Sequence, residues 1–210
     1  MVFIYNVING KQIHGQYQTV LLFFVRMKNV YSLLLMLLVA TAAHAQNFPL
    51  DFVGHWKGEI AWYQQGKSEP RKFAMQLRIL PTDTAGHYTW QIIYGDKETD
   101  NRPYVLKPVD TAKGHWMVDE QNGIILDQYW AGGKLHGVFS VGGSLIFNTY
   151  WLEKGALQVE FTSMPATPQA RTGYGTEESP HVDSYNVKSV QRGTLVKVKT
   201  SEPLPLRKPK

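Results

Sequence analysis

The feature that most constrains this chain is a period-two alternation of apolar and polar side chains that begins at Phe52. In the segment 52–63, one face carries Phe and Trp and the other carries His, Lys and Glu. The segments 72–79 and 87–94 repeat the pattern. Such alternation indicates strands with one buried and one solvated face, which is typical of antiparallel sheets. The chain is therefore predicted to be all-β.

Turn signals divide the rest of the chain into short candidate strands. These signals are Gly95-Asp96, the segment 120–123, Gly132-Gly133, Gly142-Gly143, Lys154-Gly155 and Arg192-Gly193. The strands expected between them are 103–109, 114–119, 124–130, 134–141, 144–153, 156–164, 182–191 and 194–199. Closure removes the free edges of such a meander, so we predict an antiparallel up-and-down barrel of about ten strands, with a two-sheet sandwich as the alternative.

An export signal is predicted inside the chain, at residues 27–45. The segment opens with a basic Met-Lys-Asn, continues with the apolar run 33–40, and ends in Ala43-His44-Ala45, a small-x-small cleavage pattern. The apolar run is shorter than the roughly 20 residues that a membrane-spanning helix needs. We therefore expect that residues 1–26 are not part of the native product. The mature protein would begin at Gln46 and reside in the periplasm or outside the cell.

Composition excludes several classes of site and partner. The chain has no cysteine, so core packing rather than disulfides must stabilise an exported domain, and thiolate metal sites are excluded. The net charge is +5, and removal of residues 1–45 takes away three basic and no acidic residues, which leaves +2. Nucleic-acid binding needs a basic face on the folded domain. Because the remaining excess of positive charge lies in the tail, no nucleic-acid partner is predicted.

A single barrel domain is expected over residues 46–200, because a chain of this length supports one core. Two segments interrupt the strand pattern. The segment 165–181 is rich in Pro, Gly, Thr and Glu, and loops of this length are commonly lids or disordered. We expect it to cover the mouth of the barrel. The basic, Pro-rich segment 201–210 is expected to be a mobile tail.

The first predicted strand opens with Gly54-His55-Trp56-Lys57-Gly58. This resembles the calycin superfamily of lipocalins, fatty-acid-binding proteins and nitrobindin-like barrels, whose first strand carries a Gly-x-Trp signature. The resemblance implies structural roles for Gly54 and Trp56, with the Trp at the closed end of the barrel beneath an Arg from near the last strand. Arg192 stands in that part of this sequence. The sequence departs from the haem-binding nitrobindin-like pattern at Ile60-Ala61-Trp62.

The predicted inward face is strongly aromatic. Such a lining suits a pocket for a planar or apolar ligand, with tyrosine hydroxyls to orient it. The alternative is a solid core, because a small barrel can be filled by its own side chains. The predicted ligand-binding residues are Trp62, Tyr88, Trp90, Tyr94, Trp116 and Phe139.

Candidate residues for metal, cofactor or catalytic chemistry are few. His55, His87, His115 and His136 each fall on the face opposite the aromatic residues, so no metal ring is predicted. His181, where the long loop meets a strand, is the candidate axial ligand if haem binds; no cofactor is otherwise predicted. The sequence contains no Gly-x-Ser-x-Gly elbow and no phosphate-binding loop, and it suggests no catalytic residue.

The leading hypothesis is an exported, non-enzymatic barrel that binds a small apolar or aromatic molecule in its interior. The main alternative is a cell-envelope interaction module with a filled core, which acts through its outer surface and its tail. An enzyme is a third class. An outer-membrane barrel would also show alternating strands. The charged, Pro-rich C-terminus argues against a membrane-spanning barrel, and the sequence does not indicate an oligomeric state.

Overall fold

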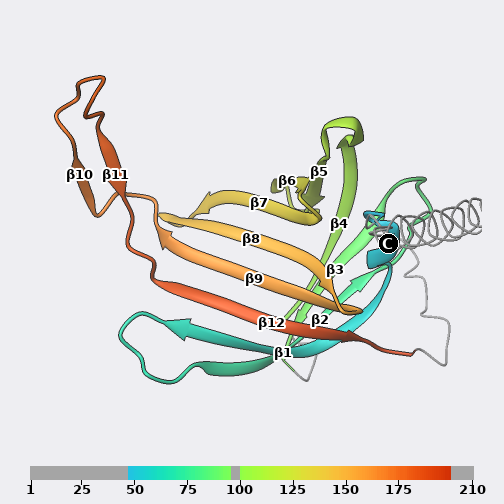
Figure 1. Ribbon diagram of the computed structural model, residues 1–210. Coiled ribbons are helices and arrows are strands. Elements are labelled where there is room, and N and C mark those ends of the chain that lie inside the picture. The colour runs from blue at the N-terminus through green and yellow to red at the C-terminus, as the bar shows by residue number, and fades with distance from the viewer. Residues whose placement is uncertain (1–46, 96–99, 200–210) are drawn as a thin grey trace, which may run out of the picture. The chain divides into compact units, whose positions relative to one another are not determined.

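The computed structural model describes residues 47–95 and 100–199. Within them, ten antiparallel strands close into a barrel in the order β1-β12-β9-β8-β7-β6-β5-β4-β3-β2 (Figure 1). The predicted all-β meander is confirmed. The export signal, the start at Met27 and the tail 201–210 lie outside the described residues. The barrel strands are β1 (Gly54–Gln64), β2 (Arg71–Ile79), β3 (Tyr88–Tyr94), β4 (Asp100–Asp110), β5 (His115–Asp119), β6 (Ile125–Ala131), β7 (Lys134–Val141), β8 (Ser144–Glu153), β9 (Ala156–Pro165) and β12 (Ser189–Lys197).

Alternation along the strands fixes which side chains face the interior. On β1, Trp56 and Ile60 are buried, whereas Lys57 and Glu59 between them are exposed. Their cross-strand neighbours on β2 keep the same parity, since Trp56 pairs with Leu77 and Ile60 with Phe73. Each strand from β1 to β8 pairs with the next in sequence, and β12 closes the barrel between β9 and β1.

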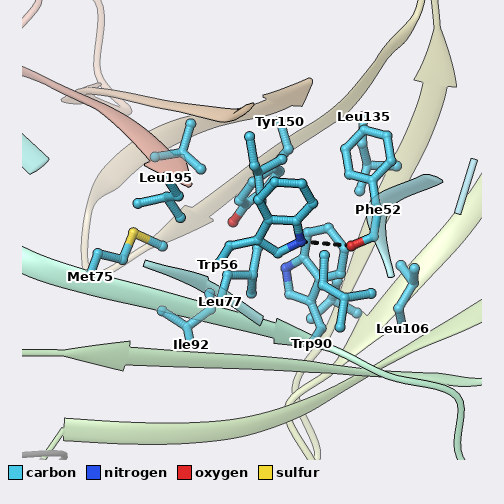
Figure 2. Close-up of a cluster of buried hydrophobic side chains, with 14 of the residues drawn as sticks. Phe52, Trp56, Met75, Leu77, Trp90, Ile92, Leu106, Leu135, Tyr150 and Leu195 are labelled. Carbon is cyan, nitrogen blue, oxygen red and sulfur yellow. Dashed lines mark hydrogen bonds between the residues drawn. The ribbon is translucent and has the colours of Figure 1, made fainter. Parts of the chain in front are cut away.

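One end of the barrel is filled by the segment that precedes β1. The 3-10 helix η1 (Leu50–Phe52) places Phe52 in the core, where the backbone oxygen of Phe52 accepts a hydrogen bond of 2.8 Å from the indole nitrogen of Trp56 (Figure 2). Phe48 stacks on Trp130 with ring centroids 4.7 Å apart and meets Trp116 edge to face at 5.1 Å. This end is therefore closed by packed aromatic rings.

Arg192 does not cover Trp56, contrary to the expectation drawn from the calycin resemblance. Its side chain points outward and pairs with Glu160 at 2.7 Å, because an outward position of β12 lies opposite an outward position of β9. The cation above the Trp56 ring is Lys197, with its amine 5.3 Å from the ring centroid. The Lys197 side chain runs across Gly54, where a side chain would overlap it.

The turn predicted at Arg192-Gly193 is wrong, because both residues lie inside the single strand β12. Gly193 is opposite Ile60 on β1, and a side chain there would overlap Ile60 and come close to the backbone oxygen of Glu59. The glycine therefore serves the close approach of two strands rather than a change of direction.

The segment between β9 and β12 forms a two-stranded ribbon of β10 (Ala170–Thr172) and β11 (Val182–Ser184). Arg171 and Asp183 join the two strands with a 2.7 Å ion pair. The ribbon extends away from the barrel wall (Figure 1, upper left). A second 3-10 helix, η2 (Thr111–Lys113), links β4 to β5. Across the described parts of the chain, no helix combines the length and apolar character needed to cross a membrane.

Candidate functional site

A cavity of about 970 Å³ occupies the barrel toward the end that is farther from η1. Its lining comes from all ten strands of the barrel, including Trp62 near the end of β1 and Phe73 near the start of β2. Small-molecule sites commonly enclose about 300–1,000 Å³. The interior of this barrel is therefore filled at one end and hollow at the other.

The six predicted ligand-binding residues divide between these two regions. Trp62, Trp90, Tyr94 and Phe139 line the cavity. Trp116 packs with Phe48 in the filled end, and Tyr88 is partly buried against the hydrophobic core. The structure thus brings four of them together. No residue of the segment 166–188 is among the lining residues, so in this structure the long loop does not cover the cavity, contrary to expectation.

An aromatic group forms the floor of the cavity. Tyr150 meets Trp90 edge to face at 5.0 Å and Phe161 at 5.7 Å. Burial raises the pKa of the Tyr150 phenol well above its ordinary value, and hydrogen bonds from the side chains of Trp90 and Asn148 act in the opposite direction. The floor is thus uncharged at physiological pH.

A row of cross-strand neighbours, which shares Phe161 with this floor, runs around the cavity wall. Because each member directly faces the next, all share the inward face. The row combines aromatic and amide side chains with one glycine, and sequence reasoning missed its amide members. In order it is Trp62, Gln191, Phe161, Asn148, Gly137 and Gln128.

Several polar atoms in this row have no hydrogen-bond partner among the described residues. Gln128 is fully buried, and both its amide nitrogen and its amide oxygen are unpaired. The amide oxygen of Asn148 and the indole nitrogen of Trp62 are unpaired as well. Buried polar groups nearly always have a partner, so these atoms mark the place where the cavity can bind one.

Gly137 makes room for the two amides. It lies between Gln128 and Asn148 in the strand register, and a Cβ atom at this position would overlap both side-chain amides. The sequence signal was a glycine at an inward position of a strand, flanked on both neighbouring strands by polar residues at inward positions. It could be read only once the register of three strands was known.

Two arginines stand at the mouth of the cavity. The Arg71 guanidinium lies over the Trp62 ring at 5.6 Å, and that of Arg102 lies over the Tyr94 ring at 4.9 Å. Arg102 also pairs with Asp100 at 3.0 Å, which raises the pKa of Arg102 and lowers that of Asp100. Burial raises the pKa of Tyr94 to about 12, although Arg102 opposes this shift. At neutral pH the mouth therefore has fixed positive charges and a neutral phenol.

The barrel wall beside the cavity is incompletely paired. The ladder between β6 and β7 runs from Gln128 opposite Gly137 to Ala131 opposite Lys134. The two strands continue as 125–127 and 138–141 without pairing to each other. The cavity lining includes residues from both of these segments. We call this unpaired stretch the β6–β7 seam.

The histidines that the structure describes lie outside the cavity. His181, the candidate haem ligand, is exposed between β10 and β11 and is absent from the cavity lining. His55 contacts Gln76 at 2.9 Å, and His115 pairs with Asp127 at 2.7 Å. In the ranges 47–95 and 100–199, no three His, Cys, Asp or Glu side chains gather closely enough to hold a metal ion.

Comparison with known proteins yields a structural neighbour and no family. No protein-family model and no curated protein matches the sequence. A solved structure that is similar is a protein of unknown function from the DUF3598 family of Nostoc punctiforme PCC 73102, with a TM-score of 0.51 and 14% identity. The match covers 71% of this chain and 48% of that chain, so this chain spans about half the length of its neighbour. The similarity shows the fold alone; it is consistent with a calycin-like barrel, and the Gly-x-Trp signature stays a resemblance.

Proposed function

We propose that the barrel binds a small molecule with an apolar or aromatic body inside its cavity, without catalysing a reaction on it. The observation that carries the proposal is the cavity of about 970 Å³ with Trp62, Trp90 and Phe139 in its lining. A bicyclic ligand buries an area similar to a tryptophan side chain, on the order of 200 Å². At about 25 cal/mol per Å² this supplies on the order of 5 kcal/mol before the costs of association.

The polar residues of the lining are suited to orienting a ligand. Tyr94 and Tyr104 place phenols near the mouth, and burial raises the pKa of both. Neutral phenols donate and accept hydrogen bonds without the desolvation cost of a charge. Glu120 is the one carboxylate among the described lining residues, so the lining offers no carboxylate pair for acid–base catalysis. A binding protein is the function that this arrangement favours.

The proposal includes export to the periplasm or the cell exterior, based on the signal pattern of residues 27–45. The test is intact-mass and N-terminal analysis of the protein purified from its native envelope or medium. We expect an N-terminus at Gln46. A product that keeps the apolar run 33–40 would contradict export with cleavage at this site.

The interaction module remains the second candidate, and one observation favours it. On the outer face, Val138 and Phe147 are cross-strand neighbours that are 53% and 40% exposed. The filled core that this candidate implies does not describe the hollow end. Deletion of residues 201–210 separates the candidates: a cavity ligand would be retained, whereas a partner that depends on the tail would be lost.

A fluorescence titration with N-phenyl-1-naphthylamine, a neutral apolar dye, tests binding in the cavity. Trp62→Ala should weaken dye binding by about tenfold, which corresponds to about 1.4 kcal/mol. Trp151→Ala is the matched control, because Trp151 lies on the outer face of β8 with Lys134 over its ring. Equal affinity of wild type and Trp62→Ala would overturn the proposal.

A further inference from the structure

We propose that Gln128 and Asn148 form a subsite for an uncharged ligand group with a donor and an acceptor side by side, namely a cis-amide or lactam. The inference rests on the proposed function and specifies the chemical class of the ligand. The observation behind it is the fully buried Gln128 side chain, whose amide nitrogen and oxygen both lack a partner among the described residues.

The unpaired amide has an energetic consequence. Burying a donor or acceptor without compensation is unfavourable, and here one side chain contributes one of each. Gln128 belongs to the cavity lining, so a molecule in the cavity lies next to its side chain, and a rotation of the amide would bring its unpaired atoms to the cavity surface. An amide side chain and a cis-amide are complementary, because each N–H can face the C=O of the other. A lactam thus satisfies both orphaned atoms at once.

Asn148 adds a second acceptor in a defined orientation. Its side chain opposes the rise that burial causes in the pKa of the Tyr150 phenol. Its amide oxygen is directed toward Gly137, because a Cβ atom placed on that glycine would overlap this oxygen. That oxygen is unpaired among the described residues. The subsite therefore presents one donor and two acceptors.

Gly137 shows that the space for these amides is built into the wall. Glycine weakens a strand interior, and Gly137 lacks the positive φ that would require it. Any Cβ at this position would overlap the amides of both Gln128 and Asn148. The subsite also lies at the base of the β6–β7 seam, since Gln128 and Gly137 are the first pair of that ladder.

The charge of the subsite favours a neutral ligand over a carboxylate. The oxygens of Gln128 and Asn148 would repel a carboxylate, and a buried anion without a cationic partner is strongly disfavoured. The cationic residues of the lining, Arg71, Lys72 and Arg102, are exposed, and Lys72 is paired with Glu59. Arg102 is already paired with Asp100. An anionic ligand held by Arg71 at the mouth is the competing possibility that the experiment must separate.

The test uses three bicyclic probes of similar size: quinolin-2(1H)-one, which is a lactam, naphthalene, and 2-naphthoate. Dissociation constants are measured by quenching of intrinsic tryptophan fluorescence. The wild type should bind the lactam about tenfold or more tightly than naphthalene, since naphthalene leaves the buried amide unpaired. Gln128→Leu should abolish this preference while naphthalene binding is retained. Gln158→Leu, at a glutamine on the outer face of β9 that is absent from the cavity lining, is the matched control and should keep it.

Gly137→Ala is a second test variant. It leaves Gln128 and Asn148 in the sequence, but the new methyl group pushes both side-chain amides aside, so it should also reduce the preference for the lactam. If naphthalene binds and the lactam binds no better, solvent already satisfies the amides and the subsite is overturned, while the cavity function stands. If no probe binds, both proposals fail. If 2-naphthoate binds most tightly and Arg71→Gln removes that advantage, selectivity lies at the mouth and the amide subsite is overturned.

Discussion

Around η1 the inward side chains of the barrel are packed against one another, whereas around Trp62 they leave a cavity of about 970 Å³. The strands and their alternation are the same at both ends. The difference is that Phe48 and Phe52, from outside the barrel strands, enter the filled end. A ten-stranded barrel is wide, and side chains from its own wall do not fill it. Added rings from the preceding segment close one end, and no described segment closes the other.

Trp56 and Trp62 show the same contrast on one strand. Both are inward-facing on β1, but the indole nitrogen of Trp56 donates to Phe52 at 2.8 Å. The indole nitrogen of Trp62 is buried without a partner in the described structure. At the filled end polar atoms are satisfied by the chain itself, and at the hollow end they are not. The unpaired buried side-chain atoms of the described residues thus gather at the hollow end.

The largest expected effect comes from breaking the filled end. Trp56→Ala should lower the free energy of unfolding by about 3–5 kcal/mol, because Trp56 is only 2% exposed and truncation leaves a cavity among packed rings. Trp62→Ala should cost about 1 kcal/mol or less, because Trp62 already borders empty space. Urea denaturation of the two variants measures both values. Equal losses would mean that the two ends are equally packed in solution.

The next largest effect is the change in stability at alkaline pH that ionisation of Tyr94, at the hollow end, should cause. Burial raises the pKa of Tyr94 from 10.0 to about 12, so between these values the unfolded state loses a proton that the folded state keeps. The resulting stability is fully present below pH 10 and is lost as the pH rises through 12, in total on the order of 3 kcal/mol. Tyr94→Phe should flatten this part of the stability curve, measured by urea unfolding at alkaline pH. Tyr104 and Tyr150 leave a residual slope, since burial raises their pKa values as well. An unchanged slope in Tyr94→Phe would place Tyr94 in solvent.

Two inward glycines, Gly193 and Gly137, allow a further comparison of packing, with smaller expected changes in stability. Gly193→Ala should lower the free energy of unfolding by about 1–2 kcal/mol, because the new methyl meets Ile60 and approaches the backbone oxygen of Glu59, which cannot move away. Gly137→Ala should cost less, because it meets the mobile ends of amide side chains beside a cavity. Thermal unfolding of both variants shows which substitution lowers the stability more. The reverse order would show that the Gln128 and Asn148 amides are rigidly held.

Sequence alone predicted the strands, and it left open whether the barrel interior is a pocket or a filled core. Period-two alternation located β1, β2 and β3 because each strand carries its own apolar face. The turn at Arg192-Gly193 was wrong because a glycine that permits close approach looks identical, in sequence, to a glycine in a turn. Arg192 was assigned to Trp56 by its place near the last strand, yet its parity in β12 points it at Glu160. Such pairings depend on register between distant strands, which local patterns do not contain.

The candidate site was visible only in part for the same reason. Trp62 and Trp90 were found because large aromatics at inward positions stand out, but size does not tell whether a ring lines a cavity or fills a core. Trp116 fills the core because Phe48 packs on it from outside the strand pattern. Gln128 was missed because a polar residue at an inward position contradicts the alternation used to find strands. Local conflicts of this kind are expected at functional sites.

The smallest expected effect tests that conflict directly. Gln128→Leu should raise the free energy of unfolding by about 1 kcal/mol in the absence of ligand, because it removes a fully buried amide without a described partner. Gln76→Leu, on the outer face at His55, is the control and should lower stability, because it breaks a 2.9 Å hydrogen bond. Both changes are read from urea denaturation. A loss of stability in Gln128→Leu would mean that its amide is satisfied in the free protein, and the hollow end would then need no ligand to complete its hydrogen bonds.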